Sequence, residues 1–265
     1  MQQLIYIRAY FMKLILRFIQ VIYSIYAFVV FLSLMLALFP FIVLASFMGK
    51  VEGGNLVYHI CRFWAQICMI LWGIRHRNIF EAPHDGNKPS ILVFNHISYM
   101  DIPVLMCAFR YQPIRVLGKA EMSRVPIFGF IYGKAVVTVD RSDASHRAKS
   151  VAVLKQVLRK NISIVIAPEG TFNMSNRPLK DFYDGAFRIA INTQTPIKPV
   201  LFLDAYDRLH YNSIFSLTPG RSRAVYLKEV PVDGYGPADV GKLKQQVFDS
   251  MEKGLEKYQA TWINK

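Results

Sequence analysis

A histidine and an aspartate five positions apart, His96 and Asp101, are the residues of this sequence best suited to acid–base chemistry. They follow Ile91–Phe94, a run of apolar residues that predicts a buried strand. Loops after the carboxyl ends of strands are where α/β sheets usually bind ligands. Ser98 or Asp101 can cap the following helix, and such a cap would bend the chain and bring Asp101 back toward His96.

These two residue types together indicate a general base. A carboxylate beside one imidazole nitrogen fixes the tautomer, so that the other nitrogen can take a proton from an alcohol. Direct attack by a bound acceptor hydroxyl is the simplest route, because no Ser or Cys is clearly partnered to His96. Ser98 is the alternative nucleophile. Taken alone, the pair fits a capping aspartate beside a surface histidine even better, so its interpretation depends on the motifs that accompany it.

Two cations also lie at the ends of predicted strands. Lys119 follows the run Ile114–Gly118 and offers a point charge suited to a phosphate. Arg141 follows the run Val136–Asp140 and can bind a phosphate or a carboxylate through a bidentate fork. Each cation also fits an ordinary surface salt bridge, so neither identifies a site by itself.

Two further segments combine a turn with polar or rigid residues. Glu169, Gly170 and Thr171 follow an apolar strand, and the glycine would let the backbone approach a ligand between two polar side chains. An ordinary strand-to-loop turn would have the same composition. The segment Thr195–Val200 carries two prolines, which suggest an edge strand or a rigid pocket wall.

The order of these groups resembles that of the glycerolipid acyltransferase family, which includes 1-acyl-glycerol-3-phosphate acyltransferase. The matching blocks cover roughly residues 90 to 200. They are Asn95-His96-x-Ser98-x-x-Asp101, Lys119-x-Glu121-x-x-x-x-Pro126-x-x-Gly129, Asp140-Arg141, Pro168-Glu169-Gly170-Thr171 and Pro196-Ile197-x-Pro199-Val200.

The resemblance implies an acyl transfer from acyl-CoA or acyl-carrier protein to the free hydroxyl of lysophosphatidic acid, giving phosphatidic acid. It implies that His96 is the catalytic base and Asp101 its partner. It also implies that Glu169, Gly170 and Thr171 hold the acceptor. Its phosphate would lie near two cations, Lys119 and Arg141. No metal and no bound cofactor are implied, and the N-terminal helices would dock on the bilayer.

Two positions depart from the family pattern. Phe172 stands where the family usually has an arginine that helps to bind the acceptor phosphate, and Asp184 stands before Gly185 where a lysine is usual. Arg177 and Lys180, from the same loop, are candidates to replace the missing cation. A lysolipid without a phosphomonoester, such as a lyso-amino-acid lipid, is therefore an alternative acceptor. The alternative that is not an enzyme is a non-catalytic membrane-binding protein.

The composition favours a membrane partner over nucleic acid. The net charge of +14 attracts phosphates of either kind. However, the sequence has no zinc-finger spacing, basic-region heptad or RNP-like strand, and a nucleic-acid binder does not need a long apolar N-terminus. The three cysteines, Cys61, Cys68 and Cys107, have no metal-binding spacing and are expected to be buried thiols in a reducing compartment.

The N-terminal segment is long and apolar enough for a membrane element. Phe18–Gly49 contains no charged residue, whereas a spanning helix needs about 20 residues and a signal peptide has a shorter apolar core. Pro40 and Gly49 could break the run. A second apolar stretch, Leu56–Ile74, suits an interfacial helix. We prefer a hairpin that keeps both ends and the catalytic domain on the cytoplasmic side; a single span, with the N-terminus outside, is the alternative.

Beyond this segment, short β-branched runs alternate with amphipathic stretches, which indicates an α/β fold. We expect a mixed, largely parallel central sheet flanked by helices, in an acyltransferase domain at 79–265 preceded by a membrane-associated helical segment at 1–78. The predicted strands are Ser90–Asn95, Ile114–Gly118, Val136–Asp140, Ile162–Ala167, Ile197–Leu203 and Arg223–Leu227. The predicted helices are Asp101–Phe109, Val125–Tyr132, Ser145–Lys160, Ala186–Asn192 and Ala238–Tyr258.

Overall fold

The computed structural model describes residues 2–139 and 144–263 of the chain. Within these residues, one sheet of seven strands runs through the domain in the order β1-β7-β6-β2-β5-β3-β4. All neighbouring strands are parallel except β6 and β7, which are antiparallel. The predicted α/β fold with a largely parallel sheet is therefore confirmed. The strands are β1 (Ile74–Phe80), β2 (Ile91–Phe94), β3 (Ile114–Lys119), β4 (Val136–Val139), β5 (Ser163–Ile166), β6 (Ile197–Phe202) and β7 (Gly220–Tyr226).

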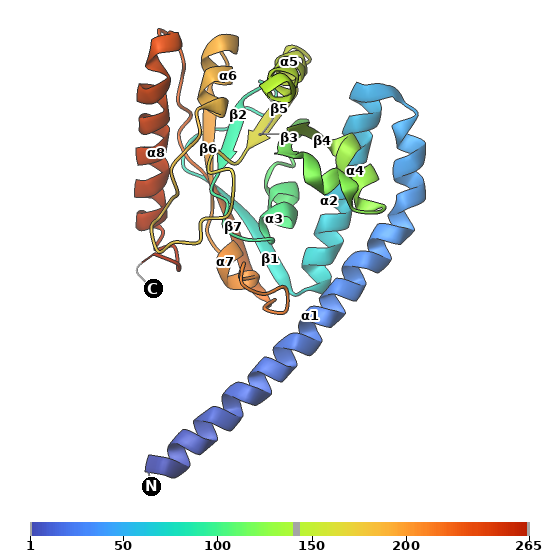
Figure 1. Cartoon of the computed structure of the whole chain (residues 1–265), viewed down its shortest axis with the longest axis vertical. Helices are drawn as coiled ribbons and strands as arrows, with labels where there is room; N and C mark the ends of the chain where they lie inside the picture. The colour runs from blue at the N-terminus through green and yellow to red at the C-terminus, as the bar shows by residue number, and fades with distance from the viewer. Residues whose placement is uncertain (1, 140–143, 264–265) are drawn as a thin grey trace.

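Helices cover both faces of this sheet (Figure 1). One face carries α2 (Gly54–Leu71), α3 (Asp101–Ala108) and α4 (Phe128–Ala135), and the other carries α5 (Ala144–Arg159), α6 (Gly185–Thr193) and α8 (Val240–Lys257). The short helix α7 (Ala205–Arg208) follows β6. Helical turns occupy Gly49–Gly53, Ala120–Arg124 and Pro237–Asp239. Helix α4 begins three residues later than predicted, after Pro126 and a left-handed Ile127 with φ of 62°.

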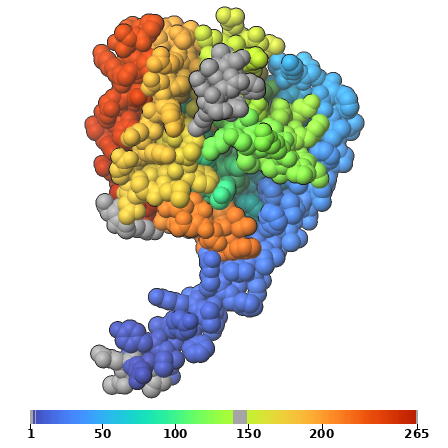
Figure 2. Space-filling model, viewed as in Figure 1, coloured from blue at the N-terminus to red at the C-terminus, as the bar shows by residue number. Residues whose placement is uncertain are grey.

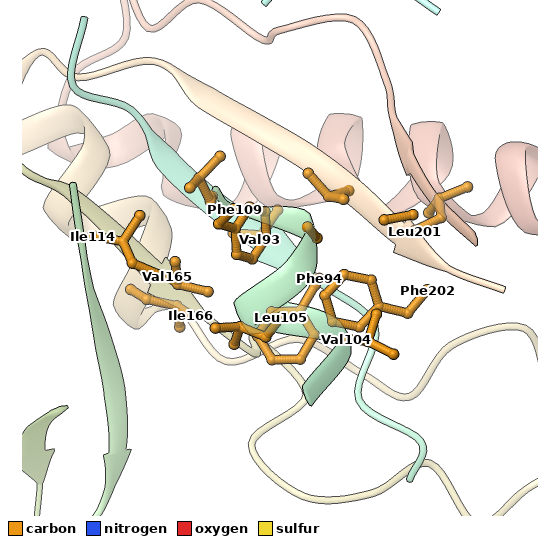
Figure 3. Packing of buried hydrophobic residues seen from close by; sticks show 14 of the residues in the cluster. Val93, Phe94, Val104, Leu105, Phe109, Ile114, Val165, Ile166, Leu201 and Phe202 are labelled. Carbon is orange, nitrogen blue, oxygen red and sulfur yellow. The ribbon is translucent and has the colours of Figure 1, made fainter. Parts of the chain in front are cut away.

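The core lies where the three central strands meet α3. Every residue of β2, β5 and β6 is buried, because helices cover these strands on both sides. Figure 3 shows Phe94 and Phe202 facing Val104 and Leu105 of α3 across this core. Such rigid packing fixes the carboxyl ends of the central strands, from which the candidate motifs extend.

One strand was not predicted. β1 begins at Ile74, where the predicted interfacial helix ends, and it spans the expected boundary between residues 78 and 79. Its sequence, Ile-Arg-His-Arg-Asn-Ile-Phe, contains four polar residues in a row and shows little apolar alternation. It forms a strand because it pairs in register with β7, nearly 150 residues further along the chain, from Ile74 opposite Gly220 to Phe80 opposite Tyr226.

The apolar N-terminus forms a single helix, α1 (Gln2–Ser46), of 45 residues. The part that includes Ala27, Met35 and Ile42 packs against α2 and the domain, and the N-terminal part projects away from it (Figures 1 and 2). The helix continues through Pro40 and ends before Gly49, whose φ of 85° begins the turn into α2. By length and composition, Ile5–Ser46 is the one helix of the described chain that could cross a membrane. The membrane topology of the hairpin formed by α1 and α2 stays a prediction.

Two glycines of α8 have opposite surroundings and provide a test of how this helix packs on the sheet. A Cβ at Gly254 would stand 2.7 Å from Leu201 Cδ1, whereas a Cβ at Gly241 would meet nothing within 4 Å. Alanine loses less backbone entropy than glycine, which favours either substitution by up to about 1 kcal/mol. We expect Gly241→Ala to raise the melting temperature and Gly254→Ala to lower it, because the second methyl overpacks the core. Equal shifts in thermal unfolding of the detergent-solubilised variants would contradict this packing.

Candidate functional site

His96 and Asp101 are in direct contact at the carboxyl end of β2. The imidazole Nδ1 lies 2.8 Å from Asp101 Oδ2. The same oxygen accepts hydrogen bonds from the backbone N–H groups of Ile97, at 2.8 Å, and Ser98, at 3.0 Å. Asp101 is 1% exposed and begins α3, where the helix dipole favours a negative charge. With Nδ1–H donating to this fixed carboxylate, Nε2 carries the free lone pair of the imidazole, whose side chain is 26% exposed.

The residues beside this pair hold the loop in place. The Asn95 amide joins β6, because its Nδ2 donates to Phe202 O at 3.1 Å and its Oδ1 accepts from Phe202 N at 2.8 Å. The Ser98 hydroxyl donates to Leu209 O and accepts from the N–H of Met100 at 2.9 Å. Ser98 is fully buried with both capacities in use. Its contacts are therefore those of a structural residue and do not suit the alternative role of nucleophile.

Glu169 links the loop after β2 to the loop after β5. Its Oε1 accepts the N–H of His96 at 2.8 Å, and its Oε2 accepts the N–H of Lys180 at 2.9 Å. The side chain has no exposed surface. The pKa of Glu169 is raised from 4.5 to about 8, chiefly because the carboxyl group is buried; the two N–H donors oppose the shift, and the nearby Asp101 adds to it. These contacts suit a residue that positions His96, whereas the sequence suggested that Glu169 would itself hold the acceptor.

The rest of this loop wraps around His96. Gly170 adopts φ of 72°, a left-handed conformation that favours glycine. The N–H of Asn173 donates to His96 O at 2.8 Å. The ammonium of Lys180 donates to Thr171 Oγ1 at 2.8 Å, which places a half-buried cation beside the Glu-Gly-Thr turn. The sequence had named Lys180 only as one possible substitute for the missing arginine.

Phe172 packs directly on the candidate base. Its ring centre lies 4.5 Å from that of His96 in an edge-to-face arrangement, and 4.9 Å from that of Tyr99. Phe94 flanks the imidazole from the strand side, at 5.8 Å. The position where the family usually has an arginine is therefore part of an aromatic wall around His96, and Lys180 is the cation of this loop that contacts Thr171.

The remaining predicted residues are less closely associated with the pair. Lys119 is exposed at the carboxyl end of β3, which lies two strands from β2 at the same edge of the sheet. Arg177 is 66% exposed and lies 3.9 Å from Asp181, so it does not contact the pair. Arg141 lies outside the described residues. Among residues 2–139 and 144–263, no three His, Cys, Asp or Glu side chains are grouped so as to hold a metal ion.

Comparison with known proteins finds similarity over the part of the chain that carries this site. A family model described as "Acyltransferase" matches residues 73–203, the segment that contains both loops of the site. The chain is 28% identical over 189 residues to a 1-acyl-sn-glycerol-3-phosphate acyltransferase from Cocos nucifera, covering 71% of this chain and 59% of the relative. It is 28% identical to the beta form of that enzyme from Homo sapiens, covering 59% of this chain and 56% of the relative. The alignments thus span less than two thirds of these relatives' length.

A solved structure has the same fold. The 1-acyl-sn-glycerophosphate acyltransferase PlsC from Thermotoga maritima superimposes with a TM-score of 0.70 at 20% identity, covering 94% of this chain and 98% of that one. Residues 73–203, just under half of the chain, thus match the acyltransferase family. The similarity to the curated relatives and the shared fold support a PlsC-like glycerolipid acyltransferase, as the motifs had indicated.

The raised pKa of Glu169 makes the stability of the protein depend on pH. Because its pKa is raised from 4.5 to about 8, the folded chain binds this proton more tightly than the unfolded chain. The resulting stabilisation is complete below about pH 4.5 and is lost as the pH rises to about 8. Glu169→Gln cannot ionise, so we expect its melting temperature to fall less than that of the wild type over this range. Identical pH profiles for the two proteins would contradict the assignment.

Proposed function

We propose that this protein transfers a fatty acyl chain from an acyl thioester, carried by CoA or acyl-carrier protein, to the free hydroxyl of lysophosphatidic acid. The observation that carries the proposal is the His96–Asp101 contact of 2.8 Å, with the second imidazole nitrogen unbound by the aspartate. The relatives named as 1-acyl-sn-glycerol-3-phosphate acyltransferases support the choice of acceptor. The product is phosphatidic acid.

The proposed reaction needs one base and no covalent enzyme intermediate. His96 Nε2 takes the hydroxyl proton of the acceptor while its oxygen attacks the thioester carbonyl. Asp101 stabilises the imidazolium that forms, because its carboxylate is held against Nδ1 by two backbone N–H groups. When the C–S bond breaks, the imidazolium returns the proton to the leaving thiolate. The new ester and the free thiol then contain every atom of the two substrates.

The acceptor phosphate is assigned to the Glu-Gly-Thr loop. Lys180 lies there, joined to Thr171 at 2.8 Å, and its backbone is fixed by Glu169. We propose that Lys180 takes the place of the family's arginine, with Thr171 and the Gly170 backbone beside it. Lys119, at the same edge of the sheet, is proposed as a further cation for the phosphate, and so is Arg141, which lies outside the described residues.

The aromatic contact of Phe172 favours a second candidate acceptor. Because an apolar ring covers His96 where a cation would bind a phosphomonoester, a lyso-amino-acid lipid is the alternative substrate. The reaction at the hydroxyl would be the same. The alternative of a non-catalytic membrane-binding protein is opposed by the ordered His96–Asp101 pair, which membrane binding does not require.

We further propose that the protein works at a bilayer, with its catalytic domain on the cytoplasmic side. The long exposed apolar helix α1 supports the membrane association. In this proposal residues 1–78 serve the membrane contact and residues 79–265 the chemistry, with β1 joining the two.

The first test concerns the base. We expect His96→Ala to lower the rate of acyl transfer by about 10²- to 10⁴-fold, because the hydroxyl then loses its proton acceptor. Asp101→Asn should also lower kcat, since it disturbs the tautomer of His96. The assay follows thiol release from an acyl-CoA in the presence of lysophosphatidic acid and purified protein in detergent micelles.

The matched control for this test is His84→Ala. His84 follows β1, whose carboxyl end lies at the edge of the sheet opposite His96, because β1 runs antiparallel to β2. This variant should keep its activity, and all variants should retain membrane association. Near wild-type turnover by His96→Ala would refute the proposed mechanism.

The second test concerns the acceptor. We expect Lys180→Gln to raise the KM for lysophosphatidic acid by about tenfold, because a charge-assisted hydrogen bond to the phosphate is lost, and Lys180→Arg to restore it. The KM for a lyso-amino-acid lipid, offered with the same acyl-CoA, should not change. If the wild type prefers the amino-acid lysolipid, or if Lys180→Gln has no effect on KM, the phosphate assignment is wrong.

A further inference from the structure

Four arginines lie side by side on one face of the strand pair at the edge of the sheet. In the register of β1 and β7, Arg75 is opposite Arg221 and Arg77 is opposite Arg223. The intervening side chains point to the other face, where His76 bonds Ser222 and Asn78 donates to Ala108 O of α3. We call this row of four residues the arginine surface.

The arginine surface has more positive charge than the structure neutralises. Asp204 is its acidic partner, at 2.8 Å from Arg223 and 3.3 Å from Arg221. Asp204 is 3% exposed, whereas Arg221 is 68% exposed and Arg75 and Arg77 are also exposed. Within the described part of the chain, no ion pair involves Arg75 or Arg77. Four arginines less Asp204 and the nearby Asp207, whose charge also acts on Arg223, leave an excess of two positive charges on this surface.

This surface begins where the domain joins the apolar helix α1. Trp72, three residues before Arg75, accepts a hydrogen bond from Tyr23 of α1 through its carbonyl, and its Nε1 donates to Ala27 O at 3.0 Å. Gly220, next to Arg221, donates its N–H to Gly73 O at 3.1 Å. The first arginine pair is therefore held within a few residues of the point at which α1 leaves the domain.

An exposed apolar loop lies at the same junction. Ile214 is 59% exposed and Phe215 is 42% exposed, in the segment that leads into β7. Gln20 of α1 donates to Ser216 O at 2.9 Å, which ties this loop to the helix. Figure 2 shows the segment around α7, in orange, directly above the projecting part of α1. Exposed apolar residues beside a cationic surface and an apolar helix are the features expected of a protein surface that contacts an anionic bilayer.

We propose that the arginine surface, with Ile214 and Phe215, is a docking surface for anionic phospholipid headgroups. The guanidinium groups bind headgroup phosphates, and the two apolar side chains enter the boundary between headgroups and acyl chains. The apolar surface of α1 supplies an attachment that does not require anionic lipid, whereas the arginine surface makes the contact of the domain depend on lipid charge. The proposal does not depend on the acyl transfer, because docking is measured separately from turnover.

The test uses a fluorescent label in the full chain. Cys61, Cys68 and Cys107 are buried, so Ile214→Cys provides the accessible thiol for an environment-sensitive bimane label. The labelled protein is reconstituted into vesicles of phosphatidylcholine alone or mixed with phosphatidylglycerol. We expect a blue shift that grows with the phosphatidylglycerol content, and we expect added salt to reverse it.

A charge-matched pair of variants tests the role of the arginines. In Arg75→Gln/Arg77→Gln/Arg221→Gln, the ratio of docked to undocked label should fall by about fivefold for each arginine removed. The control Lys149→Gln/Arg159→Gln/Lys160→Gln removes the same charge from exposed positions on and next to α5, at the end of the domain away from the projecting part of α1, and should behave like the parent. Melting temperatures check that both variants fold.

Two outcomes would overturn the proposal. The first is a blue shift that persists in the arginine variant or that does not depend on phosphatidylglycerol. The second is a label whose emission does not respond to phosphatidylglycerol, together with a KM for an acyl-carrier-protein donor that rises in the arginine variant but not in the control. These two results would assign the arginine surface to an acidic protein partner.

Discussion

The site depends on one carboxylate oxygen. Asp101 Oδ2 is the acceptor for His96 Nδ1 and for the backbone N–H groups of Ile97 and Ser98. These three donors turn the chain sharply between β2 and α3, so the same contacts shape the loop and orient the imidazole of His96. The other oxygen, Oδ1, is buried and has no hydrogen-bond partner among the described residues. Removing the carboxylate would leave buried N–H groups unpaired, a cost of about 1–3 kcal/mol each, so the histidine cannot keep its orientation without it.

Around this oxygen the protein is organised in successive layers of support. Glu169 fixes the backbone of His96, and Asn95 fixes the loop to β6. Both depend on the central strands, which are buried on both faces and cannot shift without disturbing the core. The buried central strands therefore fix the backbone of the loop, the loop backbone fixes the Asp101 carboxylate, and the carboxylate orients the His96 imidazole.

The sequence predicted the parts of the molecule that carry strong local signals. The central strands were found because they are continuous apolar runs, and the His96–Asp101 contact was expected because a helix cap at Ser98 or Asp101 would bend the chain back toward His96. β1 was missed because its arginines hide the strand pattern and its partner lies far away in the chain. The bond of Lys180 to Thr171 could not be predicted either, since it depends on Glu169 holding the backbone of Lys180 in place. Arg177 has the same charge and a similar distance in sequence, yet it points to solvent.

The aromatic wall of Phe172 and Phe94 bears on a competition that any such base must face. A histidine that can deprotonate a lipid hydroxyl can also deprotonate water, and water would convert the thioester to a free fatty acid. With ring centres 4.5 Å and 5.8 Å from the imidazole, the two phenylalanines occupy space that solvent would otherwise fill. An arginine in place of Phe172 would bring its own hydration to this position. In the proposed reaction, a phenylalanine at position 172 would therefore favour acyl transfer to the lipid over hydrolysis of the thioester.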